Sequence, residues 1–286
     1  MPSNRDDIRD FLNRRKHVVL VEVKSASGST PREAGAWMLV AVDCIFGTIG
    51  GGQLEFMAID HARRLLSEGG ADADDISVPL GPEIGQCCGG RVALGFKRVD
   101  RPLRSALVEK VDLEIAQRPH VYIFGAGHVG DALAMALSLV PLRIVLVDTR
   151  EIELSATRVP GIETCLTAMP EVVVRDAPAG SAFVVLTHDH ALDFLITAEA
   201  LARGDAAYVG MIGSKTKKAT FRSWLEREVG RPDIFDGLVC PVGGTAVKDK
   251  RPCVIAALAA AEIMTSALNH RIGEERLPRQ KARLHA

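Results

Sequence analysis

The chain has 286 residues, of which 47% are hydrophobic and 25% charged, values typical of a folded globular protein of one or two domains. Its 35 Lys and Arg residues balance 36 Asp and Glu residues, and only 5% of residues are aromatic, so neither a basic field nor a base-stacking surface for nucleic acid is expected. The N-terminal segment is charged, and no uninterrupted apolar run reaches the length of a membrane span. These features predict a cytoplasmic protein without nucleic-acid or membrane partners.

The chain has six cysteines, none of which form a C-x-x-C pair. In a chain of this size that lacks an export signal, this pattern predicts neither a disulfide framework nor a structural zinc site of the usual spacing.

The N-terminal part alternates short apolar runs with glycine-rich loops. The hydrophobic patterns predict helices over 6–16 and 54–67, and strands over 17–24, 37–42, 76–80 and 91–96. Residues 100–118 are mixed and charged, and we place a domain boundary near residues 117–119. The sequence therefore predicts an N-terminal mixed α/β domain over 1–116.

The C-terminal part alternates strands with helices, which predicts a mostly parallel, doubly wound sheet. The expected strands are 120–124, 143–147, 171–174, 182–186, 207–209 and 238–240, and the expected helices are 131–139, 191–203, 215–229 and 254–268. This predicts a Rossmann-like domain over 117–270, followed by a flexible basic tail over 271–286.

A G-x-G-x-x-G turn follows the first of these strands. Gly125 would permit the tight turn, Gly127 would let a phosphate approach the backbone, and Gly130 would let helix and strand pack closely. Asp148 ends the next strand, where an acid can bind ribose hydroxyls. His128 is unusual in such a turn; it would contact a ligand or cap the helix. The pattern predicts a cleft for a dinucleotide, although the glycines alone could serve only packing.

The segment Thr187-His188-Asp189-His190 follows an apolar strand, with Asp193 close behind. It partly matches the ligand run of metallo-β-lactamase-like hydrolases, but Leu192 replaces the expected aspartate. We therefore favour a polar loop that lines a ligand over a bound metal, and expect no direct metal site in the protein.

Cys87 and Cys88 lie between Gln86 and two glycines. Thiolates are soft ligands and nucleophiles, which suits sulfur or soft-metal chemistry. The alternative is a pair of small buried residues in a turn.

Three consecutive glycines, Gly50, Gly51 and Gly52, precede a predicted helix. Such a run can expose backbone N–H groups as a cradle for an anion, and the guanidinium of Arg32 would add a phosphate partner. The alternative is an ordinary loop that leads into a helix, with a surface arginine.

Seven stretches between about residues 20 and 220 together carry a family resemblance. They are SGSTPREAGAWM, GTIGGGQLE, GPEIGQCCGG, VYIFGAGHVGDALA, VLVDTR, LTHDHALD and YVGMIGSKTKK. The chain resembles the XdhC/CoxI family, accessory proteins for the maturation of xanthine dehydrogenase and other molybdenum hydroxylases. The segment 241–255 departs from the family pattern, with Arg251 and Cys253 at positions where the family has Thr and an acid.

The resemblance implies a binding protein rather than a turnover enzyme. It would hold molybdenum cofactor (molybdopterin), support its sulfuration and deliver it to an apo-hydroxylase such as xanthine dehydrogenase, with a cysteine desulfurase as a further partner. Separately, a homodimer is expected because symmetric dimers are the commonest assembly of soluble chains. The implied cofactor-binding residues are Arg32, Gly50, Gly51, Gly52, Gln53, Glu55, Gln86, Cys87, Cys88, Gly125, Gly127, His128, Gly130, Asp148, His188 and His190.

Two other functions remain open at this point. A nicotinamide-dependent oxidoreductase is suggested by the glycine turn, but no Tyr-x-x-x-Lys pair is visible, and Tyr122 and Tyr208 lie in predicted strands. A metal hydrolase would depend on His188 and His190.

Overall fold

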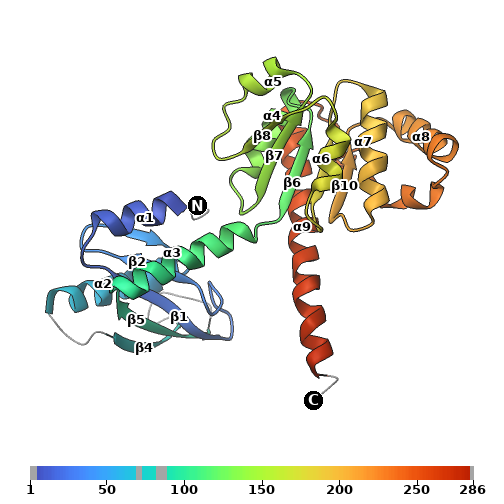
Figure 1. Ribbon diagram of the computed structural model, residues 1–286. Coiled ribbons are helices and arrows are strands. Elements are labelled where there is room, and N and C mark those ends of the chain that lie inside the picture. Colours follow the sequence, from blue (N-terminus) through green and yellow to red (C-terminus); the bar gives the residue numbers. More distant parts are fainter. Residues whose placement is uncertain (1–4, 69–72, 82–88, 284–286) are drawn as a thin grey trace. The chain divides into compact units, whose positions relative to one another are not determined.

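The structure is a computed structural model that describes residues 5–68, 73–81 and 89–283 (Figure 1). The chain divides into two compact units, 1–116 and 117–286. Each unit encloses its own hydrophobic clusters, and each is described separately below.

The N-terminal unit contains a five-stranded antiparallel sheet with the order β3-β2-β1-β5-β4. Its elements are α1 (Arg5–Arg14), β1 (Val19–Ser27), β2 (Trp37–Val40), β3 (Ile45–Gly47), α2 (Gly52–Glu68), β4 (Ala73–Pro79), β5 (Arg91–Arg98) and α3 (Arg101–Ala116). The end of β1, the start of β2, the end of β3, the end of β4 and the start of β5 all lie at one end of this sheet, because neighbouring strands are antiparallel.

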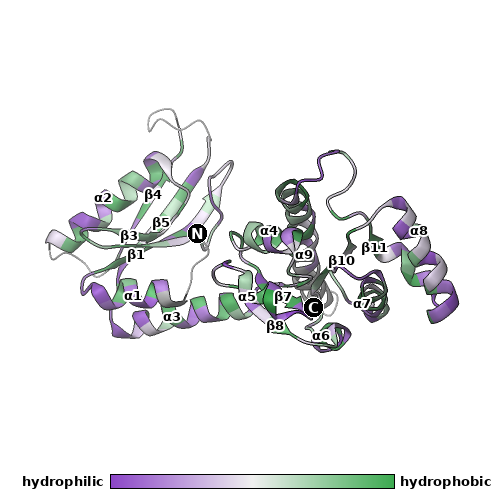
Figure 2. Cartoon of the chain, turned by 90° about the horizontal axis from the view of Figure 1, so that it is seen from above, coloured by the Kyte–Doolittle hydropathy of each residue, from purple (hydrophilic) through white to green (hydrophobic). Residues whose placement is uncertain are grey.

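Helices cover both faces of the N-terminal sheet (Figure 2). Side chains alternate along β1, so that Val19, Val21 and Val23 point to one face, where they pack with Leu54 and Ala58 of α2. On the opposite face, apolar residues of α1 and α3 form a second cluster.

The C-terminal unit contains a six-stranded parallel sheet with the order β11-β10-β9-β6-β7-β8. Its strands are β6 (His120–Phe124), β7 (Arg143–Asp148), β8 (Glu163–Leu166), β9 (Ala182–Val185), β10 (Tyr208–Met211) and β11 (Leu238–Val239). Its helices are α4 (His128–Leu137), α5 (Glu151–Ala156), α6 (Pro170–Asp176), α7 (His190–Arg203), α8 (Lys215–Trp224), a π-helical turn (Leu225–Val229), a 3₁₀ turn (Pro232–Gly237) and α9 (Pro252–Arg283).

Helices lie on both faces of this sheet, so it is doubly wound. Helices α4 and α9 share one cluster with the sheet, whereas α6, α7 and α8 share the other. The chain runs from β6 outward to β8 and then returns to β9 on the other side of β6. This reversal is the topological switch point at which Rossmann-like folds bind ligands. The predicted fold class is confirmed.

Several segments differ from the sequence prediction, and β3 and α5 are among the elements that it did not include. The predicted strand 171–174 lies in α6. Pro170 at the first helical position favours a helical φ, and Val174 is fully buried where the helix packs on the sheet. The true edge strand β8 was not predicted. The charged segment 100–118 contains α3, whose Leu107 and Val111 are buried one turn apart while its charged residues face solvent.

Helix α9 continues through residues 271–283, which the sequence analysis assigned to a flexible tail. Among the described residues, one stretch of it, Pro252–His270, has a mean hydropathy of 1.4 and enough length to cross a membrane. Within the unit, Ala256, Ala259 and Ile263 of this stretch are buried in the cluster that α9 shares with α4.

Candidate functional site

The turns that follow β6, β7 and β9 meet at the carboxyl edge of the parallel sheet. A pocket at this edge is lined by residues from all three turns, among them Gly125, Asp148, Thr149, Thr187 and His188. The position is the switch point, so the predicted ligand-lining segments are brought together there.

The three glycines of the turn after β6 differ in their surroundings. Gly125 has φ +113°, and a Cβ there would lie 2.5 Å from the Leu186 carbonyl oxygen. A Cβ at Gly130 would lie 1.8 Å from the Gly125 carbonyl oxygen. A Cβ at Gly127 would meet nothing within 4 Å. Gly125 and Gly130 therefore serve close packing, whereas Gly127 leaves open space where a ligand can approach the backbone.

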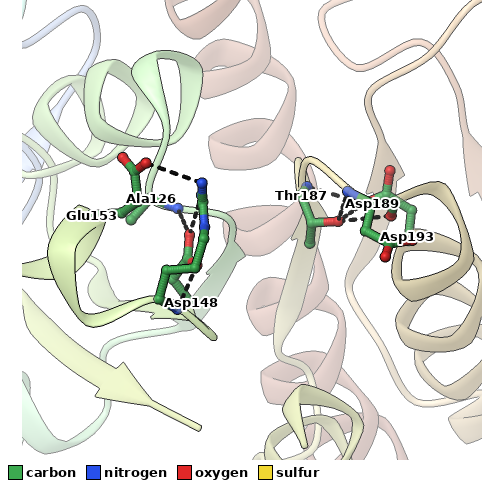
Figure 3. Close-up of polar contacts among 7 residues, drawn as sticks. Ala126, Asp148, Glu153, Thr187, Asp189 and Asp193 are labelled. Atoms are coloured by element: carbon green, nitrogen blue, oxygen red, sulfur yellow. Dashed lines mark hydrogen bonds and ion pairs between the residues drawn. The ribbon is translucent and has the colours of Figure 1, made fainter. Parts of the chain in front are cut away.

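Asp148 is only 5% exposed and binds partners within the chain (Figure 3). Its Oδ2 accepts hydrogen bonds from the backbone N–H of Ala126 at 2.7 Å and from Nη2 of Arg150 at 3.1 Å. Its Oδ1 accepts from the backbone N and from Nε of Arg150, at 2.9 and 3.1 Å. Burial opposes ionisation, but these hydrogen bonds outweigh it and hold the pKa of Asp148 below its ordinary value.

Arg150 is a residue that sequence reasoning missed at this site. Its guanidinium binds Asp148 and also Glu153, with 3.0 Å between Nη1 and Oε1. The hydrogen bond to Asp148 raises the pKa of Arg150, and 34% of its side chain remains exposed. The signal in the sequence is its position two residues after the acid that ends β7.

The loop after β9 is held by a buried ion pair between Asp193 and Lys217, and by the hydrogen bonds between Thr187 and Asp193 that Figure 3 shows. Asp193 is fully buried, and its Oδ1 accepts hydrogen bonds from the backbone N–H and hydroxyl of Thr187, at 3.0 and 2.7 Å. Lys217 donates to the other carboxylate oxygen. Asp189 caps α7 by accepting from the backbone N–H groups of two following residues. Asp193 is thus a structural counter-ion for Lys217, a partner that the sequence did not indicate.

The histidines proposed for this edge are exposed to solvent: His128 at the start of α4, His188 in the loop before α7, and His190 at the start of α7. Within residues 5–68, 73–81 and 89–283, no group of three or more His, Cys, Asp or Glu side chains is arranged to hold a metal ion. The four cysteines in these ranges, Cys44, Cys165, Cys240 and Cys253, are free.

The two tyrosines of the chain lie in strands, as the sequence predicts. The hydroxyl of Tyr208 donates to Glu262 of α9 at 2.8 Å, and burial together with this carboxylate raises the pKa of Tyr208. Glu262 also accepts from the backbone N–H of Gly243. Glu262 therefore links Tyr208 to Gly243 in the divergent segment that follows β11.

In the N-terminal unit, three glycine-containing loops of the sequence motifs pack together at one end of the sheet. A Cβ at Gly50 would lie 2.8 Å from Cβ of Pro31, and a Cβ at Gly28 would lie 3.0 Å from Cα of Gly90. Ser29 also forms a β-bridge with Gly89. The loops over 28–36 and 47–52 and the base of the turn that begins after Leu80 are thus in direct contact.

The glycine cradle before α2 has a hydrogen-bond partner within the chain, and binding of an external anion there stays a prediction. Oε2 of Glu55 accepts hydrogen bonds from the backbone N–H groups of Ile49 and Gly51, at 3.0 and 3.2 Å, and from the hydroxyl of Thr48. The N–H of Gly50 donates to Thr48 at 3.1 Å. Glu55 lies in the first turn of α2, so its carboxylate reaches backbone N–H groups of the loop that the sequence suggested for an anion.

Other predicted residues of the N-terminal unit remain accessible. Arg32, Gly52 and Gln53 are exposed, and Arg32 lines a groove with Trp37 and Phe46. Gln86, Cys87 and Cys88 lie outside the described residues, so their roles stay predictions. The glycines that flank them, at positions 81, 89 and 90, line a second pocket with Ser27 and Gly28.

Together these features define a two-unit α/β protein with a Rossmann-like C-terminal unit. Residues 121–263 match the model of the XdhC Rossmann domain, and residues 11–75 match the XdhC and CoxI family. The chain belongs to the XdhC and CoxI family, as the sequence motifs indicate.

Two similar proteins extend this comparison. The crystal structure of a Bacillus halodurans protein, described as a xanthine dehydrogenase, aligns with a TM-score of 0.78 and 19% identity over 93% of this chain and 96% of that one, which shows a shared fold. The uncharacterized protein YqeB of Escherichia coli (strain K12) is 25% identical over 260 residues. That alignment covers 86% of this chain and 42% of YqeB, so the chain spans less than half of that relative.

Proposed function

We propose that the protein is a molybdenum cofactor-binding accessory protein in the maturation of xanthine dehydrogenase or a related molybdenum hydroxylase. It holds the cofactor, supports its sulfuration and delivers it to the apo-enzyme. Membership of the XdhC and CoxI family supports the accessory role. We further propose a cytoplasmic homodimer that receives sulfur from a cysteine desulfurase.

The packing of the three motif loops in the N-terminal unit supports this proposal most directly. These loops are far apart in the sequence, yet Gly50 contacts Pro31 and Gly28 contacts Gly90. They carry the exposed guanidinium of Arg32, which suits a phosphate, and one of them continues in the sequence into the segment with two thiols suited to molybdenum and sulfur. Loops that share one ligand need such a common location.

The test is to measure cofactor retention and hydroxylase activation for Cys87→Ser and Cys88→Ser. We expect at least one variant to lose most of its cofactor in ultrafiltration followed by pterin analysis, because a hydroxyl ligates a soft metal poorly. Cys44→Ser is the matched control, since Cys44 lies in the same unit on the β2–β3 connection, at the opposite end of the sheet. Its retention should equal that of the wild type.

Two results would contradict the proposal at different levels. If wild-type protein leaves all pterin in the filtrate, it does not hold the cofactor. If it retains cofactor but both cysteine variants match it in retention and activation, the cysteines serve packing and the site lies elsewhere.

A further inference from the structure

We propose that the carboxyl edge of the parallel sheet in the C-terminal unit binds a nucleotide whose ribose carries a 2′-phosphate, and that Arg150 selects this phosphate. This inference concerns the Rossmann-like unit alone, and it does not depend on how the N-terminal unit handles the molybdenum cofactor.

The first step is that Asp148 has no acceptor capacity left for ribose hydroxyls. A carboxylate offers about four lone-pair positions, and Asp148 already accepts four hydrogen bonds, one from Ala126 and three from Arg150. A ribose diol would have to displace the guanidinium from a buried carboxylate. Asp148, the acidic residue that would usually bind an unphosphorylated ribose, therefore has no free acceptor position.

The second step is that the guanidinium of Arg150 has more N–H groups than its contacts with Asp148 and Glu153 use. A guanidinium has five N–H groups, and its contacts with Asp148 and Glu153 use one each at Nε, Nη1 and Nη2. Within the described residues, the terminal nitrogens thus keep N–H groups for a ligand, on a side chain that is 34% exposed. The bidentate contact with Asp148 fixes the plane of the guanidinium, which favours recognition of a phosphate.

The third step is the location of Arg150 beside the glycine turn. The hydrogen bond from Ala126 to Asp148 ties the end of β7 to the turn after β6 (Figure 3). Arg150 is hydrogen-bonded to the same carboxylate of Asp148. A Cβ at Gly127 would meet nothing within 4 Å, so a ligand phosphate can approach the backbone of this turn. In Rossmann-like folds the adenosine ribose of a nucleotide bound there reaches the end of the next strand, where a nearby arginine accommodates a 2′-phosphate.

Glu153 provides a further way to test the site. Its carboxylate accepts from Nη1 of Arg150 on the first turn of α5 and would repel an incoming phosphate. Removing its charge should strengthen phosphate binding without disturbing the contact between Asp148 and Arg150.

The experiment is calorimetric titration of the full chain with NADP⁺ and, separately, with NAD⁺. We expect the wild type to prefer NADP⁺ by at least about tenfold, the advantage of charge-assisted hydrogen bonds. Arg150→Gln should abolish that preference, and Glu153→Gln should tighten NADP⁺ binding by about two- to fivefold. Arg158→Gln is the control, because Arg158 donates only to nearby backbone carbonyls in the described contacts.

The proposal is overturned if NADP⁺ does not bind, if NAD⁺ binds equally or more tightly, or if Glu153→Gln leaves NADP⁺ binding unchanged or weakens it. Circular dichroism checks that Arg150→Gln is folded. If it is unfolded, the test depends on Glu153→Gln, which keeps both Arg150 and Asp148. Cofactor retention by the same variants is measured separately. If the wild type does not retain molybdenum cofactor, the proposed function is contradicted, but the result on nucleotide binding is unaffected.

Discussion

Gly127 and Gly130 lie three residues apart in one turn, yet only one of them has room for a side chain. Gly127 has φ −73°, which any residue adopts, and open space around it. At Gly130 an added Cβ would overlap a backbone oxygen that cannot rotate away. One glycine thus keeps a surface open for a ligand, whereas the other lets α4 approach β6.

We predict that Gly130→Ala destabilises the C-terminal unit by about 1–3 kcal/mol or more through overpacking, whereas Gly127→Ala costs less than about 1 kcal/mol. Urea unfolding followed by the fluorescence of Trp224 measures both. Gly127→Val should fold and lose nucleotide affinity, because its side chain fills the approach to the backbone. Equal stabilities for the two alanine variants would show that the turn relaxes around either side chain.

Asp148 makes the stability of the C-terminal unit depend on pH. Its pKa is lowered in the folded protein, so its contribution is present above the unfolded pKa, near 3.9, and is lost as the pH falls through the lower folded value. We predict that Asp148→Asn lowers the free energy of unfolding by about 1–3 kcal/mol at pH 7. The difference from the wild type should shrink below about pH 4. A difference that stays constant from pH 7 to pH 3 would exclude ionisation as the cause.

The packing roles of Gly125 and Gly130 could be predicted from the sequence because they depend on a short, continuous segment. The partners of Asp193 and Glu55 could not. Lys217 reaches Asp193 from a helix 24 residues later, and Glu55 binds its own loop only because α2 begins at Gly52. Such contacts depend on how elements pack, which a pattern of residue types does not specify.

At the scale of elements, long periodic segments were predictable and short edge elements were not. β8 has four residues, Glu163–Leu166, and pairs with a single neighbour, β7, so it has no continuous apolar pattern. In α6, three consecutive valines favour a strand by intrinsic propensity, but packing against the sheet overrides that preference. The central strands β6, β7 and β9 are buried and apolar, and the sequence located all three.

Small residues let α9 pack closely against the sheet and α4. Ala259 is fully buried there, whereas Ala257, two residues earlier on the same helix, is exposed. We predict that Ala259→Leu destabilises the C-terminal unit by about 1–3 kcal/mol, because the added atoms have no space.

Ala257→Leu is the matched control for that substitution. It makes the same chemical change in the same helix and should alter the free energy of unfolding by less than about 0.5 kcal/mol. Urea unfolding of both variants, followed by Trp224 fluorescence, provides the comparison. Equal losses would mean that the substitution acts on the helix itself and not on its packing.

At the scale of the whole molecule, the chain combines two units with separate cores. The clusters built on β1 and β5 contain only residues from 1–116, and those built on β6 and β9 contain only residues from 117–286. Each unit contains one of the two tryptophans of the chain, Trp37 or Trp224. The stability of each unit can therefore be followed by its own fluorescent residue.

We predict that Leu94→Ala, which removes a fully buried side chain from the N-terminal core, destabilises that unit by about 2–5 kcal/mol. In a Trp224→Phe background, the unfolding transition reported by Trp37 should shift to lower urea concentration. In a Trp37→Phe background, the transition reported by Trp224 should stay in place, because none of the contacts in its core involve Leu94. Equal shifts in both backgrounds would show that the two units unfold as one cooperative body despite their separate cores.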